Sequence, residues 1–335
     1  MTNQPDIVAI GDVVIDAFIE LLPKEAEIDP SPKDHHPLLC MTYGSKLPFK
    51  SVTIISGVGN SPNAAVSFAR LGLKSGLASN IGVDSYGHDV LAAMKSEQVS
   101  TEFIHINPGK KTNYHYVLWY KDDRTILIKH EEYAYRLPRF NAHKKPRWIY
   151  LSSLGENSLA FHRQLIDYLN DHADVKVAFQ PGTFQMKLGT DALAGIYKRT
   201  ELFFCNKEEA QLITGVKEVD IKKLARALHE LGPRVVCITD GPHGSYVSDG
   251  TKVLSMRNYP DPKPPLERTG AGDAYSSTFT AAVAMGESIE TAMLWAPINS
   301  MNVVQNVGAQ AGLLRKSALL DLLKNAPADY KPKEF

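Results

Sequence analysis

The chain has 335 residues, of which 44% are hydrophobic and 22% are charged, a mixture typical of a globular protein with a sizeable core. Lysine plus arginine and aspartate plus glutamate both number 37, so the formal net charge is zero. This balance offers nucleic acid or an anionic membrane no overall electrostatic attraction, and we expect neither as a partner.

The three cysteines, Cys40, Cys205 and Cys237, are too few and too widely spaced for a disulfide framework or a zinc site. Two of them lie in apolar runs, LFFC and VVCIT, where a buried and unreactive thiol is the usual state. Acidic residues such as Asp6 and Asp12 interrupt the first apolar run, and no apolar stretch approaches the roughly 20 residues that span a bilayer. We therefore expect a soluble, cytoplasmic protein.

In chain order, residues 6–16 predict a strand, IVAIG, that ends in a turn with polar side chains. Residues 23–51 contain five prolines and little periodicity, which favours an irregular excursion over a packed element. From residue 52 onward strands and helices alternate, and this alternation predicts right-handed crossovers and a mostly parallel sheet. Residues 112–120 and 125–129 break the alternation and predict a β-hairpin that serves as a lid or an interface.

The remaining expected elements follow from the same alternation of short apolar runs and amphipathic segments. The expected strands are 52–55, 76–81, 103–106, 148–151, 176–179, 202–205, 235–239 and 245–247. The expected helices are 62–71 (with Pro62 in its first turn and Gly72 as its cap), 88–97, 159–172, 207–212, 221–231, 274–285, 289–307 and 317–324.

The segment Thr269-Gly270-Ala271-Gly272-Asp273 opens one of these helices. Glycines at a helix start let backbone N–H groups converge, and the helix dipole adds partial positive charge, so the segment predicts an anion hole. A carboxylate there repels phosphate, so its presence indicates a proton acceptor, worth about 10²–10⁴-fold in rate. The alternative is an ordinary helix start in which Asp273 complements the dipole.

Three further polar segments follow expected strands. Asn206 and Glu209 lie three residues apart after LFFC, where they suit Mg²⁺ held through water, although a capping box explains them equally well. The glycine-bearing segment 239–244 follows VVCIT and would let the backbone approach a nucleotide, although a plain turn is an alternative. Residues 59–63 precede a helix, and we expect Asp16 to follow the first strand; Asp and Asn side chains suit vicinal hydroxyls.

At this point the residues resemble a family. Segment 270–273, Gly-Ala-Gly-Asp, resembles the second signature of the ribokinase/PfkB kinases, and segment 63–72 resembles the first. Segments 82–87, 206–209 and 239–244 are similar to the other landmarks of the family, in the same order and spacing. The resemblance covers nearly the whole chain. It implies one α/β domain, residues 1–335, folded as a ribokinase-like three-layer sandwich with a mostly parallel sheet and a small β lid, here residues 31–55 with 112–130.

The resemblance also implies a function, namely transfer of the γ-phosphoryl group of ATP to a hydroxyl of a small sugar or sugar-like substrate. Asp273 would deprotonate the acceptor hydroxyl, and the amides of residues 270–272 would stabilise charge on the transferring group. The other implied roles fall in three groups: Asn206 and Glu209 for phosphates and water-bound Mg²⁺; Thr239, Gly241, Gly244 and Asn302 for ATP; and Asp16, Gly59 and Asn63 for the substrate. The charge-stabilising amides are those of Gly270, Ala271 and Gly272.

Alternate residues of a strand share a face, so the lid hairpin has two distinct sides. Asn113 and His115 lie on one side, whose mixed polarity suits a polar ligand, and we expect both to bind substrate. Tyr114 and Tyr116 lie on the other side, which favours packing against the domain or a second subunit. We therefore expect a homodimer formed through the lid.

The sequence departs from the family pattern at three places. Val58-Gly59 stands where the family has paired glycines, and Gln180 begins a segment that replaces an Asp-x-Asn motif. Glu267-Arg268 stands where the family has Asp-Thr beside a monovalent cation, which leaves use of such a cation open. We expect the Arg268 guanidinium to compete for Glu267 and to weaken any potassium effect.

Other functions remain as alternatives. A nucleoside kinase of the adenosine or inosine type is favoured by the lid aromatics Tyr114, Tyr116, Trp119 and Tyr120, which could stack on a base. A phosphosugar kinase needs clustered basic residues, and the lysines near the lid form no tight cluster. A binding protein that has lost chemistry is disfavoured because Asp273, Asn206 and Glu209 are all present.

Overall fold

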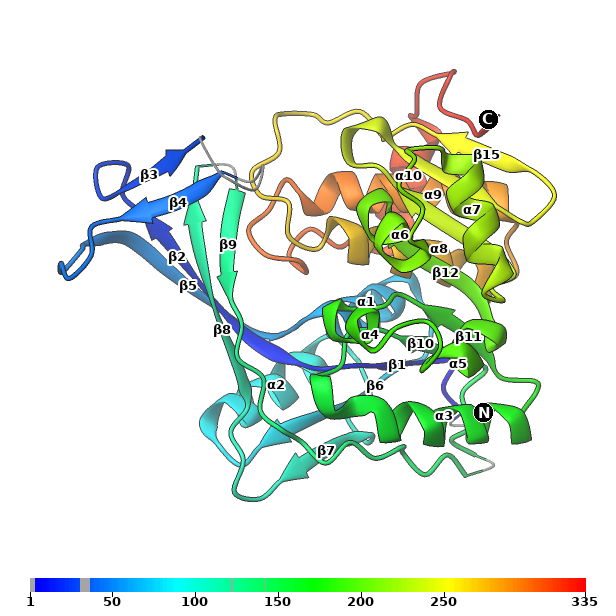
Figure 1. Ribbon diagram of the computed structural model, residues 1–335, viewed down its shortest axis with the longest axis horizontal. Coiled ribbons are helices and arrows are strands. Elements are labelled where there is room, and N and C mark those ends of the chain that lie inside the picture. Colours follow the sequence, from blue (N-terminus) through cyan, green and yellow to red (C-terminus); the bar gives the residue numbers. More distant parts are fainter. Residues whose placement is uncertain (1–3, 31–36, 122, 142) are drawn as a thin grey trace.

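The computed structural model describes residues 4–30, 37–121, 123–141 and 143–335. A ten-stranded sheet forms its centre (Figure 1). In the order in which they lie across the sheet, its strands are β16 (Lys333–Glu334), β15 (Val253–Met256), β14 (Ser245–Ser248), β13 (Val235–Thr239), β12 (Thr200–Asn206), β11 (Lys176–Phe179), β10 (Trp148–Leu151), β1 (Ile7–Ile10), β6 (Ser75–Gly82) and β7 (Ile104–Asn107). The strands from β13 to β7 run parallel, and β14, β15 and β16 add to one end in antiparallel pairs.

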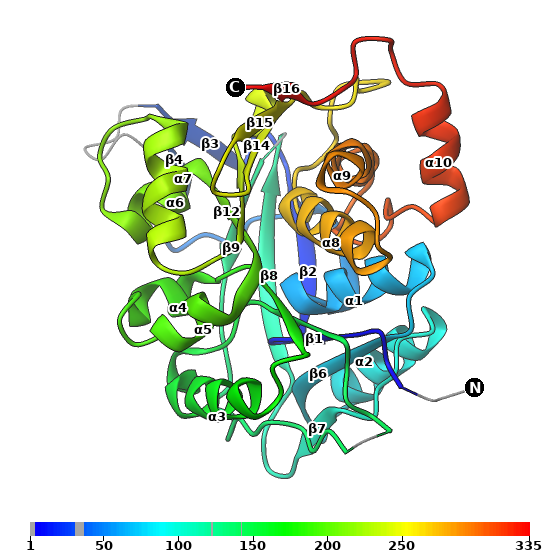
Figure 2. The same cartoon turned by 90° about the vertical axis from the view of Figure 1, so that its right-hand side faces the viewer.

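Helices cover both faces of this sheet (Figure 2). On one face lie α1 (Asn60–Leu71), α2 (Ser85–Ser96), α8 (Ala271–Ala284), α9 (Ile289–Val303) and α10 (Lys316–Lys324). On the other lie α3 (Leu159–Asp171), α4 (Thr183–Leu188), α5 (Ala194–Arg199), α6 (Lys207–Thr214) and α7 (Ile221–Glu230). Strands such as IVAI and WIYL are buried throughout because both faces of a parallel sheet are covered. The predicted α/β sandwich with a mostly parallel sheet is confirmed.

A second, four-stranded sheet stands apart from the main body and lies at the left of Figure 1. Its strands are β5 (Phe49–Val58), β2 (Val14–Leu21), β8 (Asn113–Tyr120) and β9 (Asp123–Leu127), in that order. The pair β8–β9 is the predicted hairpin. A further hairpin joins β3 (Ala26–Asp29) to β4 (Leu38–Met41), so the expected irregular excursion contains strands, although residues 31–36 of the expected lid lie outside the described part.

Strand β2 is absent from the prediction of one strand and a turn over residues 6–16. The chain instead leaves β1 through Gly11 and re-enters a strand at Val14. Asp12 N donates to Ser153 O at 2.8 Å, and a Cβ at Gly11 would lie 2.7 Å from that same oxygen. Only glycine therefore lets the segment after β10 approach this closely, and the contact fixes Asp12 at the edge of the main sheet.

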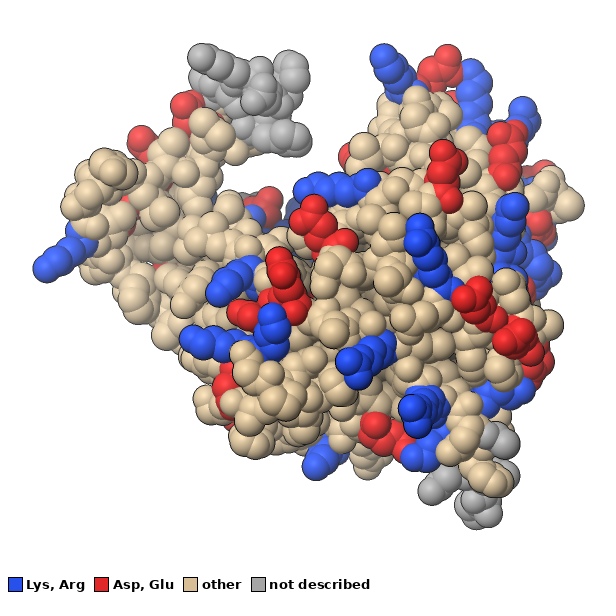
Figure 3. All heavy atoms as spheres, turned by 60° about the horizontal axis from the view of Figure 1, so that its bottom comes forward, with Lys and Arg blue, Asp and Glu red and all other residues tan. Residues whose placement is uncertain are grey.

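Charges of both signs alternate over the surface shown in Figure 3, as the zero net charge leads one to expect. Among the residues that the structure describes, none of the helices is both long and apolar enough to cross a membrane.

Candidate active site

Polar residues follow five neighbouring parallel strands at their carboxyl ends, and they all line one cavity of about 860 Å³. These residues are Asp12 after β1, Ser153 after β10, Gln180 after β11, Asn206 at the end of β12 and Thr239 at the end of β13. The strands lie side by side in that order, so the cavity runs along the sheet edge from β1 to β13. Ligands of open α/β sheets bind at this edge.

The predicted anion hole lies in the wall of this cavity. Gly270 is the cap of α8 and has φ 82°, a left-handed conformation that disfavours any side chain. A Cβ at Gly270 would also lie 2.7 Å from Ala309 Cα, whereas one at Gly272 would meet nothing within 4 Å. The loop is therefore packed on its inner side and open on the side of the cavity, where the first-turn amides of a helix have no intrahelical acceptor.

Asp273 lies in the first turn of α8 and is 8% exposed. Neutral amide groups hold both of its oxygens. Asn60 Nδ2 donates to Oδ1 at 2.8 Å, Asn63 Nδ2 donates to Oδ2 at 2.8 Å, and Gln180 Nε2 donates to Oδ1 at 3.1 Å. The carboxylate is thus fixed in direction, and within the described residues it forms no ion pair.

The amide of Gln180 is itself oriented by neighbours on the sheet and on α8. Ser276 Oγ donates to Gln180 Oε1 at 3.0 Å, and the Tyr150 hydroxyl donates to the same oxygen. The oxygen of the amide is therefore occupied, and its NH₂ group faces Asp273. Gln180 had been noted in the sequence only as a departure from the family pattern.

At the β12–β13 end of the cavity, Asn206 and Glu209 form the capping box that the sequence left as the alternative. Asn206 Oδ1 accepts from Glu209 N at 2.7 Å, and Glu209 Oε2 accepts from Asn206 N at 2.8 Å. Both residues still line the cavity, as do Thr239, Gly241 and Gly244. Burial raises the pKa of the Glu209 carboxyl, and the charge of Asp273 adds to this effect.

Three of the predicted site residues do not line the cavity. Asp16 lies in the middle of β2 rather than after the first strand, and Asp12 occupies the expected position instead. Asn302 is turned away, because its Nδ2 donates to Gly312 O at 2.7 Å. Asn113 is buried, and its side chain hydrogen-bonds to the backbone of two other segments. Its Nδ2 donates to Val13 O at 3.5 Å, and its Oδ1 accepts from Glu131 N at 2.8 Å. Gly59, Asn63 and His115 do line the cavity.

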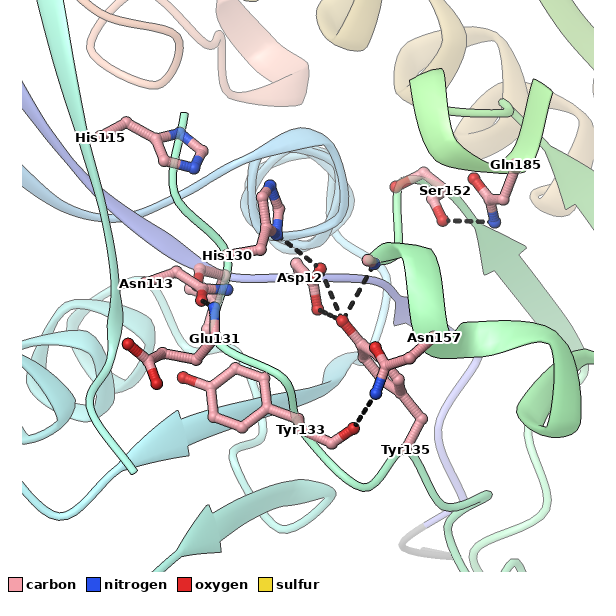
Figure 4. A network of polar contacts seen from close by, with 12 residues as sticks. Asp12, Asn113, His115, His130, Glu131, Tyr133, Tyr135, Ser152, Asn157 and Gln185 are labelled. Carbon is pink, nitrogen blue, oxygen red and sulfur yellow. Dashed lines mark hydrogen bonds and ion pairs between the residues drawn. The ribbon is translucent and has the colours of Figure 1, made fainter. Parts of the chain in front are cut away.

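The end of the cavity nearest β1 contains a polar network that the sequence does not predict (Figure 4). Asp12 accepts from the Tyr135 hydroxyl at 2.9 Å and lies 3.0 Å from His130 Nδ1. His130 lines the cavity together with His115. Asp12 stands at a strand end and could have been found by the same rule as Asn206, whereas His130 lies in an irregular segment and gives no such signal.

Glu267 lies beneath the anion hole and is 1% exposed. Its Oε1 accepts from Thr269 N at 2.6 Å, and the guanidinium of Arg124, on β9, approaches the same oxygen at 3.8 Å. The arginine beside Glu267 is therefore Arg124 of the small sheet, and the expectation that Arg268 would occupy this place is corrected. Sequence proximity favoured Arg268, which instead lines the cavity.

The sequence matches the model of the pfkB family carbohydrate kinases over residues 34–316. The chain belongs to the pfkB carbohydrate kinase family. This membership confirms the family that the signatures resemble, and with it an ATP-dependent kinase whose acceptor is an alcohol group.

Relatives of this pfkB-family chain include sugar and nucleoside kinases. The ribokinase of Bacillus subtilis is 26% identical over 271 residues, which cover 79% of this chain and 87% of that protein. The cytidine kinase of Thermococcus kodakarensis is 29% identical over 242 residues, which cover 69% of this chain and 82% of that protein. Among solved structures, Arabidopsis thaliana ribokinase complexed with ribose and ATP matches with a TM-score of 0.75 and 19% identity, covering 96% of this chain and 99% of that one. The ribokinase-like fold is thereby confirmed.

Proposed function

We propose that this pfkB-family chain transfers the γ-phosphoryl group of ATP to a hydroxyl of a small sugar or sugar-like polyol, with Asp273 as general base. The observation that carries the proposal is a buried carboxylate in the first turn of α8, held by three neutral amides and facing an open cavity. A carboxylate without a paired cation can accept a proton from a substrate hydroxyl. The amides of Gly270, Ala271 and Gly272 lie beside it and would bind the charge that develops on the transferring group.

The chemistry of the β12–β13 end supports ATP with Mg²⁺ as the phosphoryl donor. Gly272 leaves open space beside the anion hole, and Thr269 Oγ1 is buried without a hydrogen-bond partner among the described residues. The raised pKa of Glu209 reflects a buried carboxyl that a nearby cation would stabilise in its ionised form. Mg²⁺ bound with ATP would neutralise phosphate charge, while Asn206 and Glu209 would hold its water ligands, and Thr239 and Gly244 would border the nucleotide. No group of three or more His, Cys, Asp or Glu side chains in the described chain suits direct metal ligation.

The β1 end of the cavity, with Asp12, Asn63 and His115, would hold the acceptor. The small sheet would act as its lid, because His115, Arg124 and Ile126 reach the cavity from β8 and β9. Asp273 lies between the two ends, as a base must in order to reach both the hydroxyl and the phosphoryl group.

A nucleoside kinase remains the second candidate, favoured by the likeness to cytidine kinase. The aromatic residues that suggested base stacking do not support it, since Tyr114, Tyr116, Trp119 and Tyr120 are absent from the residues lining the cavity. A sugar or polyol acceptor therefore stands first.

The first test is ATP consumption by the purified chain against a panel of sugars, polyols and nucleosides. With the best substrate, Asp273→Asn should reduce turnover by at least about 10²-fold, because the amide cannot accept the proton, while ATP affinity stays within a few fold. Gln185→Asn, in the buried network beyond the cavity, is a control for fold damage. Retention of more than about a tenth of the wild-type rate would show that Asp273 is not the general base.

A further inference from the structure

Two histidine rings, His115 and His130, line the β1 end of the cavity. Figure 4 shows the His130 ring against the Asp12 carboxylate. His130 Nδ1 lies 3.0 Å from Asp12 Oδ2, and His115 Nδ1 lies 3.5 Å from Asp16 Oδ1. The two ring centroids are 5.2 Å apart. The Asp12 carboxylate beside His130 Nδ1 favours the tautomer that carries its proton there, which leaves a lone pair on Nε2 of His130. His130 thus offers a hydrogen-bond acceptor, and His115 lies next to it.

Hydrogen bonds from a neighbouring tyrosine fix the Asp12 side chain in its position beside His130. The Asp12 side chain is 3% exposed, and both of its oxygens accept from the Tyr135 hydroxyl at 2.9 Å. That hydroxyl in turn accepts from Gly155 N at 2.9 Å. Burial, with the charge of Asp12 added, raises the pKa of Tyr135 far above its ordinary value, so Tyr135 remains a proton donor. Asp12 therefore acts only as an acceptor here, and His130 must donate to it through Nδ1.

The outer edges of the two rings differ in what they contact. His115 Nε2 is buried and has no hydrogen-bond partner within the described residues. The His130 ring packs edge-on against Phe184, with centroids 5.7 Å apart, which fixes the plane of the ring. A buried polar nitrogen without a partner is unfavourable, and a hydroxyl group, which can both donate and accept, would satisfy His115 Nε2 as well as His130 Nε2.

The charge of this end of the cavity favours an uncharged ligand. Asp12 and Asp273 both face it, and in the described chain the lysines and arginines that line the cavity are Arg124 and Arg268. The Arg124 guanidinium lies 3.8 Å from Glu267, and Arg268 belongs to the loop that enters the anion hole. A phosphate or carboxylate group bound beside His130 would therefore lie close to the Asp12 carboxylate, which would repel it.

We infer that His130, positioned by Asp12, accepts a hydrogen bond from a substrate hydroxyl remote from the one phosphorylated. With His115 it selects an uncharged polyhydroxy substrate over phosphorylated or carboxylated analogues. The inference rests on the proposed function and deepens it, because it names the substrate class and a specificity-determining residue on an irregular segment outside the sequence signatures.

The test uses the full chain and the best neutral substrate from the panel, with His130→Phe, which keeps a ring against Phe184 and removes the acceptor. His88→Phe, on an exposed position of α2, is the matched control. We expect His130→Phe to raise the KM for the sugar roughly fivefold to tenfold, the size of one lost hydrogen bond, and to leave the KM for ATP unchanged. Tyr135→Phe should produce part of the same effect, because it frees Asp12. Melting temperatures of all variants separate this effect from loss of fold.

Analogues of the same sugar that each lack one hydroxyl identify the hydroxyl that donates to His130. For the analogue that lacks it, wild type and His130→Phe should have equal kcat/KM, whereas the other analogues should retain the difference. The phosphate ester and the aldonic acid of the sugar should react at least about tenfold less efficiently than the neutral compound. Equal loss on every analogue, no loss at all, or efficient use of a charged analogue would each overturn the inference. A wild-type chain that phosphorylates nothing in the panel would instead overturn the proposed function.

Discussion

Glu209 illustrates how a single side chain can serve both the fold and the site. Its carboxylate closes a capping box with Asn206 and lines the cavity, where burial raises its pKa. A carboxyl group whose folded-state pKa is raised stabilises the fold fully below its ordinary pKa of about 4.3, and this stability is lost as pH rises through the raised value. At neutral pH the ionised Glu209 carboxylate therefore lowers the stability of the fold when no ligand is bound.

Glu209→Gln removes this titration and keeps an oxygen for Asn206 N. Without ligands, we expect the variant and the wild type to melt alike at pH 4 and the variant to melt increasingly higher as pH approaches 7. At neutral pH it should also need more Mg²⁺ for half-maximal rate, with little change in the KM for sugar. Thermal unfolding between pH 4 and 8 and a Mg²⁺ titration at saturating substrate measure the two effects. Glu230→Gln, at an exposed position of α7 outside the cavity lining, should show neither effect. A melting difference that is constant with pH would contradict the assignment.

At the scale of elements, one ion pair joins the small sheet to the anion-hole loop. Arg124 on β9 reaches Glu267, whose other oxygen accepts from Gly308 N at 3.3 Å. The carboxylate thus already has a positive partner and two amide donors. Because the guanidinium supplies positive charge beside Glu267, a monovalent cation bound there would compete with Arg124 of the small sheet for the same carboxylate.

We therefore expect potassium to stimulate the wild-type kinase weakly or not at all. Arg124→Gln should become more responsive to potassium, because it leaves Glu267 buried without its cationic partner. Initial rates in potassium, compared with rates in tetramethylammonium salts, measure the response at saturating substrates. Arg234→Gln, which removes a surface pair with Glu201, is the control. Strong stimulation of the wild type, or an unchanged response in Arg124→Gln, would show that the pair does not replace a cation.

The small sheet has one face toward the cavity and an apolar face turned outward. Ile54, Tyr116 and Leu127 lie in one cross-strand row and are 53%, 49% and 51% exposed, while His115 and Ile126 line the cavity on the opposite side. A row of large apolar side chains at this exposure favours burial against another surface. A second copy of the chain, docked on this sheet, remains our prediction.

Tyr116→Ala should then weaken or abolish a dimer without changing the cavity. Sedimentation velocity over a range of concentrations should show a shift toward monomer in this variant. Leu212→Ala truncates a side chain on α6 that is 70% exposed and should leave the oligomeric state unchanged. A wild-type chain that sediments as a monomer at every concentration would remove the basis for the prediction.

At the scale of the whole molecule, the sequence predicts the strand ends well because an apolar run followed by a polar residue marks the edge of a parallel sheet. This rule located Asn206 and Thr239, whereas Asp273 was found from the glycines that open α8. The rule could not separate Asp12 from Asp16, since both residues interrupt one apolar pattern that extends from β1 into β2.

This rule cannot predict contacts between segments that lie far apart in the sequence. The position of His130 depends on hydrogen bonds that hold the residues after it. Glu131 N donates to Asn113 Oδ1, and Asn157 Nδ2 donates to Tyr133 O. The partner of Glu267 comes from β9 rather than from the adjacent residue. Such pairings follow from how the two sheets meet, which local propensity does not encode.

The place of β1 in the main sheet bears on how the chain is made. This strand is synthesised before β6 and β10, yet it lies between them in the sheet, and its four residues are buried. One edge can pair once β6 has been synthesised, but the other waits for Trp148–Leu151. Until then a nascent chain carries an apolar strand with unpaired backbone groups, which is a template for pairing with neighbouring chains. Between translation of β6 and of β10, one edge of β1 is therefore open to such pairing.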